Sequence, residues 1–80
     1  MKNDRTEYCL TIDIKCSNDQ TKMLSIRGFF TEDDADNFTQ KVQKKYEILF
    51  KDTSTHDPQQ EYDAHSPEDA LIILNINPDD

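Results

Sequence analysis

The sequence predicts a small α+β domain in the order β-β-α-β, with one helix packed on one face of a three-stranded, mainly antiparallel sheet. Three observations lead to this fold class: an alternating segment near the N-terminus, a helical apolar period in the middle, and a short apolar run near the C-terminus. A chain of 80 residues has room for one modest core. We therefore expect a single domain over residues 1–80.

The first element is a strand over residues 8–16, where apolar and polar side chains alternate. The apolar side consists of Tyr8, Leu10, Ile12, Ile14 and Cys16. This alternation is typical of a strand with one buried face. Turn-forming residues follow at 17–19, and residues 21–30 again carry apolar side chains on one parity. A β-hairpin is the expectation, with Met23 and Phe29 on its solvent-facing side.

A helix is predicted near residues 32–50. Thr31 and Asp34 fit a capped start, and acids in the first turn favour the positive end of the helix dipole. The apolar residues recur at spacings of three and four, at Ala35, Phe38, Val42, Tyr46 and Leu49. This period is that of a helix with one buried face. The hairpin and the helix together make a unit over residues 6–51.

The last third of the chain is expected to be a loop followed by a strand. Residues 52–69 form an acidic polar loop, because 52–65 show no period and Ser66 with Pro67 fits one short helical turn. Residues 70–76 are apolar on both parities, as in a strand buried on both faces. The predicted strand order is 2-1-3, and an acidic tail covers residues 77–80.

One sheet face is left open in this arrangement, and an open apolar face commonly marks association. We therefore predict a homodimer formed through this face or through the edge of the last strand. The expected dimer face consists of Met23, Phe29, Ile72 and Leu74.

The formal net charge of −8 is concentrated in the last third of the chain. Residues 1–51 contain nine acids and nine bases, whereas residues 52–80 contain eight acids and no lysine or arginine. Acids without local counter-ions repel one another and cost stability. Two explanations stay open here, namely solubility and a surface that attracts a basic partner.

The composition argues against an enzyme. Gly28 is the only glycine, which excludes the glycine-rich phosphate loops of nucleotide-binding enzymes. No recognisable catalytic spacing is present, so we expect no catalytic residues and no cofactor. A metal site is not expected either, because the candidate ligands match no metal motif; they are His56, Asp57, Asp63 and His65.

Several features indicate a cytoplasmic protein. The N-terminal segment is charged and no apolar run exceeds five residues, so neither a signal peptide nor a membrane span is expected. Cys9 and Cys16 lie roughly 23 Å apart along one predicted strand, too far for a disulfide, and free thiols are typical of a reducing compartment. The negative charge also disfavours direct binding to nucleic acids and to anionic membranes.

The remaining prediction is that acidic side chains of this chain bind another protein. Glu61 and Asp63, at alternate positions of an extended segment, would lie about 6.6 Å apart, close to the spacing of phosphates on one DNA strand. We expect such acids to occupy the DNA-binding surface of a basic protein. The predicted contact residues are Asp57, Glu61, Asp63, Glu68, Asp69, Glu32, Asp33 and Asp36.

In length, charge balance and four of these acids, the chain resembles the class of small acidic phage-encoded proteins that mimic DNA during host takeover. The four acids are Glu61, Asp63, Glu68 and Asp69. The class includes inhibitors of the histone-like nucleoid protein HU. The resemblance implies a stoichiometric inhibitor that acts in the bacterial cytoplasm and blocks the DNA-contacting surface of a dimeric basic protein.

The alternative is an inhibitor or adaptor that binds a host protein through the exposed apolar sheet face. Salt distinguishes the two hypotheses. The affinity of a DNA mimic for its partner falls steeply as the salt concentration rises, whereas the affinity of an apolar docking face does not.

Overall fold

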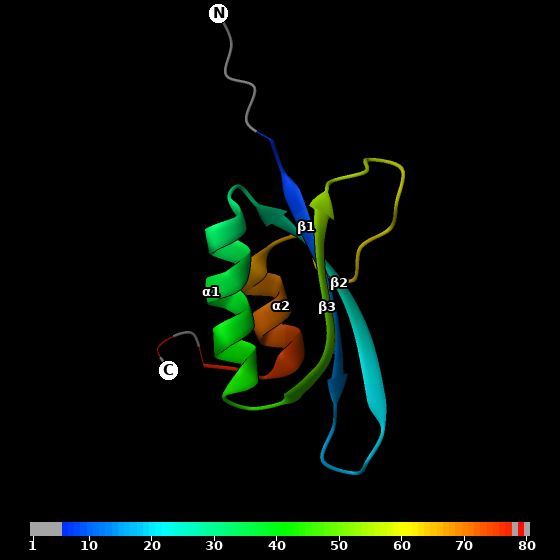
Figure 1. Ribbon diagram of the computed structural model, residues 1–80, viewed down its shortest axis with the longest axis vertical. Helices are drawn as coiled ribbons and strands as arrows, with labels where there is room; N and C mark the ends of the chain where they lie inside the picture. The colour runs from blue at the N-terminus through cyan, green and yellow to red at the C-terminus, as the bar shows by residue number, and fades with distance from the viewer. Residues whose placement is uncertain (1–5, 78, 80) are drawn as a thin grey trace, which may run out of the picture.

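The computed structural model of the protein describes residues 6–77 and 79. In chain order the elements are β1 (Tyr8–Lys15), β2 (Thr21–Phe29), α1 (Glu32–Gln43), β3 (Glu47–Thr55) and α2 (Pro67–Leu74). The strands form one antiparallel sheet in the order β2-β1-β3, and both helices lie on the same face of it (Figure 1). The predicted α+β class and three-stranded antiparallel sheet are confirmed, and a second helix is added.

The central strand β1 supplies the middle of the core. Leu10, Ile12 and Ile14 are fully buried on the helix side, as their alternation predicts. The core that they join consists of Leu24, Ile26, Phe29, Ala35, Phe38, Val42, Ala64, Ala70, Leu71, Leu74 and Ile76. Burial of this apolar surface is the main favourable contribution to folding.

The third strand is not the segment that the sequence predicted. Helix α1 ends at Gln43 rather than near residue 50, and the chain then returns as β3 through part of the segment predicted to be a loop. Only Ile48 and Thr53 of β3 are half-buried, and its other residues are exposed. An edge strand with so little buried surface lacks the alternation that marks a strand in sequence.

Residues 70–76 are not a strand, because α2 occupies most of that segment. Ser66 caps α2 by accepting a hydrogen bond from the backbone N–H of Asp69, and Pro67 stands at its first position. The helix ends at Asn75, which adopts the left-handed conformation (φ 60°, ψ 44°) that commonly terminates helices. The apolar run therefore divides by helical period, with Leu71 and Leu74 buried and Ile72 exposed.

A bulge at Gly28 turns Phe29 into the core. The β1–β2 register shifts between Tyr8 and Cys9, opposite Gly28, whose φ is +101°. This extra residue reverses the side on which Phe29 points. Phe29 is 1% exposed and packs edge-on against Phe38, with ring centroids 5.5 Å apart. The prediction that Phe29 faces solvent is therefore wrong.

The two edge strands of the sheet, β2 and β3, differ in whether another backbone segment pairs with their outer side. On the outer side of β2, Asp63 and Ala64 both donate backbone N–H groups to the Ser25 carbonyl, and Arg27 donates to the Ala64 carbonyl. Among residues 6–77 and 79, by contrast, no backbone segment pairs with the outer side of β3.

The described helices are all too short or too polar to cross a membrane.

Candidate protein-binding surfaces

Both helices begin at the same end of the molecule, where the N-terminus of β1 also lies (Figure 1). Thr31 Oγ1 accepts the backbone N–H of Asp34 at 3.0 Å, and Ser66 Oγ accepts that of Asp69 at 3.1 Å. These hydroxyl caps satisfy helix N–H groups without using carboxylates. The acids of both first turns therefore keep their carboxylates for other contacts.

The connection from β3 to α2 is folded around Tyr62. The Tyr62 hydroxyl accepts the backbone N–H of Asp57 at 2.8 Å and donates to the Asp57 carbonyl at 3.1 Å. Its ring is 8% exposed and lies against the His56 imidazole, with centroids 5.2 Å apart. Burial raises the pKa of the Tyr62 hydroxyl above its usual value of 10.0. This connection is therefore held in place although it contains no helix or strand.

Asp63, predicted to contact a partner, instead serves the fold. Its Oδ2 accepts the backbone N–H of Ser25 at 2.8 Å, and its own N–H donates to the Ser25 carbonyl. The side chain thus satisfies an edge N–H group of β2 that would otherwise need water. Asp36 is also engaged, because it pairs with Lys51 of β3.

A second ion pair fixes the chain just before β1. Arg27 donates two hydrogen bonds to the Glu7 carboxylate, from Nε at 2.8 Å and from Nη2 at 3.1 Å. The pKa of Glu7 is lowered from its usual 4.5, chiefly by this hydrogen bonding. The contact is bidentate, which is the strongest geometry for an arginine–carboxylate pair.

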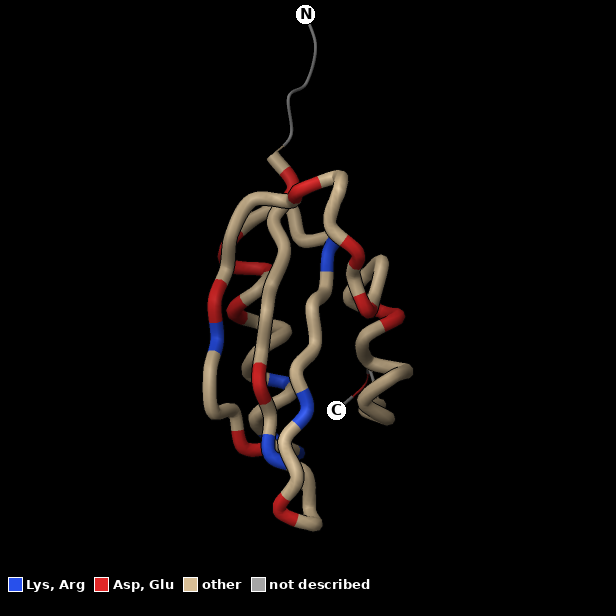
Figure 2. Tube along the Cα trace, turned by 90° about the vertical axis from the view of Figure 1, so that its right-hand side faces the viewer, with Lys and Arg blue, Asp and Glu red and all other residues tan. Residues whose placement is uncertain are grey.

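Seven of the eight predicted contact acids are exposed without a cation partner among the described residues, and six remain when Asp63, which binds the Ser25 N–H, is set aside. Four of them come from the loop and from the first turn of α2, and we call them the acidic flank: Asp57, Glu61, Glu68 and Asp69. Acidic positions of these two segments lie on the same side of the molecule, beside β2 (Figure 2). The other two, Glu32 and Asp33, belong to the first turn of α1.

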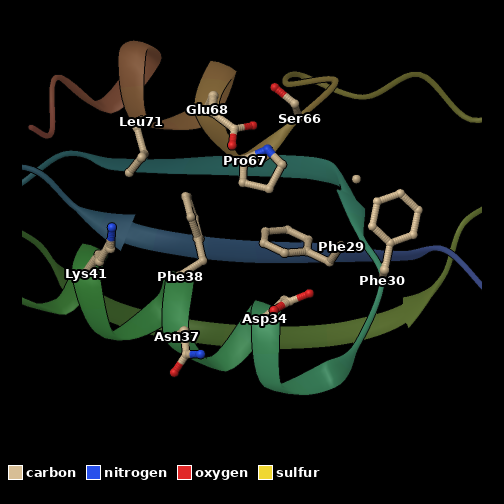
Figure 3. A pocket seen from close by; sticks show the side chains of 11 residues that line it. Phe29, Phe30, Asp34, Asn37, Phe38, Lys41, Ser66, Pro67, Glu68 and Leu71 are labelled. Atoms are coloured by element: carbon tan, nitrogen blue, oxygen red, sulfur yellow. The ribbon is translucent and has the colours of Figure 1, made fainter. Parts of the chain in front are cut away.

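Between α1 and α2 lies a hollow of about 560 Å³, which we call the interhelix groove. Its apolar lining is Phe29, Phe30, Phe38 and Leu71, and Asp34 of α1 and Glu68 of α2 lie on opposite walls (Figure 3). Asp34, Phe38 and Lys41 are spaced as one helix face, a signal that was present in the sequence. The groove could not be recognised from this face alone, because its second wall was predicted to be a strand.

The sheet face opposite the helices carries a second exposed apolar group. Met23 and Phe50 are 61% and 52% exposed, and both pair with Asp13 across the sheet. Met23 is thus on the open face, as predicted. The other three residues of the predicted dimer face are not there: Phe29 and Leu74 are core residues, and Ile72 is exposed on α2. The homodimer itself stays a prediction.

Candidate metal ligands do not cluster within residues 6–77 and 79. Groups of three or more potential metal ligands are absent from this part of the chain. Cys9 is buried beside Ser54, and both Cys9 and Cys16 are free thiols.

Comparison with known proteins gave no match: no family model, no curated protein and no solved structure is similar to this chain.

Proposed function

We propose that the protein binds the DNA-contacting surface of a basic DNA-binding protein, with its carboxylates in the places of DNA phosphates. A nucleoid protein of the HU type is the favoured partner, and the bacterial cytoplasm is the place of action. The acidic flank carries this proposal, because it presents four exposed carboxylates without cation partners among the described residues. Unneutralised acids on one side repel each other, and a cationic partner relieves that repulsion.

The anchoring of the loop supports a binding role for these acids. The Tyr62 hydrogen bonds and the pairing of residues 63–64 with β2 hold the backbone that carries Asp57 and Glu61. A surface that is ordered before binding loses less entropy on association. Each exposed ion pair contributes only about 0.2–1 kcal/mol, so the acids must act together and neighbouring contacts must add to them.

A mobility-shift competition tests the proposal. The protein is titrated into a preformed complex of HU with DNA, at low and at high salt. We expect release of the DNA at low salt and much weaker release at high salt, because the contact is electrostatic. A variant with the acidic flank neutralised should lose competition; its substitutions are D57N, E61Q, E68Q and D69N. Asp63 is left unchanged because it holds β2.

A matched control separates the acidic flank from net charge. It removes the same number of negative charges, four, but from β1, β3 and the β1–β2 turn. Its substitutions are D13N, D19N, E47Q and D52N. This control should compete nearly as well as the wild type. If both variants lose competition equally, net charge alone is responsible, and if neither loses it, DNA mimicry is wrong.

The exposed pair Met23 and Phe50 favours a second candidate, an inhibitor or adaptor that docks through the open sheet face. Large apolar side chains grouped on a surface commonly mark a contact site. The discriminating variant is M23S with F50S, which leaves all acids in place. Loss of partner binding in this variant, with no salt dependence in the wild type, would favour the second candidate.

A further inference from the structure

The interhelix groove combines an apolar lining with acids at one end. Phe38 presents its ring from α1 and Leu71 its side chain from α2, while Asp34 and Glu68 lie on opposite walls where the helices begin (Figure 3). Lys41 lies on the α1 wall one turn beyond Phe38. Negative charge thus lies at the end of the groove where the helices begin, which we call the acidic end, and Lys41 lies toward the other end.

The groove is formed by the fold itself. The Gly28 bulge brings Phe29 under the helices, where its ring contacts Phe38. Pro67, at the first turn of α2, closes one side against Gly28. Core packing therefore keeps the aromatic floor in place. Neither Asp34 nor Glu68 has an ion-pair partner in the described part of the chain.

We propose that this groove receives an arginine side chain of the basic partner, an inference that depends on the proposed function. The guanidinium would lie between the carboxylates of Asp34 and Glu68, and the aliphatic part would lie along the groove over the small exposed parts of Phe38 and Leu71, which are 5% and 7% exposed. Guanidinium is planar and offers donors in several directions, so it can donate to two carboxylates on opposite walls and suits this site better than the compact ammonium group of lysine.

Charge complementarity decides between this occupant and a purely apolar one. An apolar side chain seated here would take water from Asp34 and Glu68 without replacing its hydrogen bonds, which is costly. The described arginine of this chain, Arg27, is held by Glu7, so it is not offered to a second copy. The acidic end therefore fits a cationic side chain from another protein.

The test uses N-acetyl-L-arginine methylamide as the probe and amide NMR spectra of the full chain as the readout. We expect saturable shifts of the Asn37 and Leu71 amides, and much smaller ones with the norleucine analogue. The variant D34N with E68Q should weaken probe binding about tenfold, since each lost carboxylate removes one ion pair. The control E47Q with D52N changes the net charge equally and should bind the probe like the wild type.

A second variant guards against loss of folding. N37K adds a cation at an exposed position of α1 that lines the groove, and it should block the probe while the helix stays intact. Equal probe binding by wild type, D34N with E68Q and N37K would overturn the arginine site. So would an absence of shifts at Asn37 and Leu71.

The HU competition assay separates this inference from the proposed function. If the wild type releases DNA and D34N with E68Q does so at the same concentration, the arginine site is wrong and DNA mimicry survives. If the wild type releases no DNA, the proposed function is wrong even where the probe binds. A higher concentration requirement for D34N with E68Q, but not for E47Q with D52N, supports both.

Discussion

Replacement of Gly28 by alanine tests the β-bulge that places Phe29 under the two helices. Gly28 has φ +101°, a conformation that L-residues rarely adopt. A Cβ atom at this position would lie 3.2 Å from Pro67 Cδ and 3.2 Å from Ser66 Cα. The second of these is a backbone atom at the start of α2, so it cannot move without moving the helix. The variant G28A is therefore strained by both its own backbone and its neighbour.

The magnitude follows from these two contributions. Strain at a disfavoured φ costs about 1–3 kcal/mol, and the close contact adds to it, so we expect a loss of about 2–3 kcal/mol. A domain of this length has a total unfolding free energy of about 4–12 kcal/mol. With a urea m-value of about 1 kcal/mol/M for so small a domain, the unfolding midpoint should fall by about 2–3 M.

The assay is urea unfolding followed by far-UV circular dichroism. T21A is the control, because Thr21 is exposed at the start of the same strand and should change stability by less than about 0.5 kcal/mol. A midpoint for G28A within about 0.5 M of the wild type would refute the reasoning. Either Gly28 would then lack its positive φ, or α2 would not begin against β2.

Three further predictions use the same unfolding assay. F29A should lose about 3–5 kcal/mol, whereas F50A should lose only about 1 kcal/mol, because the first ring is core and the second is 52% exposed; similar losses would contradict the assigned sheet faces. E7Q should lose about 1 kcal/mol at pH 7 by weakening the pair with Arg27. Because folding lowers the Glu7 pKa, this contribution is present above the ordinary carboxyl pKa and disappears as pH falls through the lowered one, so an equal wild-type advantage at low pH would argue against the pair. D63A should lose about 1–2 kcal/mol by leaving the Ser25 N–H without its acceptor, and a neutral result would return Asp63 to the surface acids.

The sequence predicted those helices and strands that have one buried face and one face exposed to solvent. The alternation of Leu10, Ile12 and Ile14 and the period of Ala35, Phe38 and Val42 both persist in the structure. Strand β3 was not predicted, because it buries few side chains and its sequence therefore shows no alternation of apolar and polar residues. Residues 70–74 were missed because a short run of apolar residues fits a helix and a buried strand equally well.

The candidate surfaces were predictable only where charge alone defines them. The sequence shows which acids lack lysine or arginine neighbours in the chain, and most of these are exposed. It does not show that Asp63 binds Ser25 across 38 positions, or that Asp36 meets Lys51 across 15. The interhelix groove depends on the Gly28 bulge and on α2, and each of these requires tertiary contacts.

The unequal edges of the sheet limit how copies of this chain can add strands to one another. An unpaired strand edge is a template for a further strand. Here β3 offers nine residues of such an edge, whereas residues 63–64 already occupy the middle of the β2 edge. Two copies that joined through β3 would use both free β3 edges and leave outside the two β2 edges, each occupied at its middle by residues 63–64. Addition of a further strand to such a pair would therefore have to displace residues 63–64 from the middle of β2.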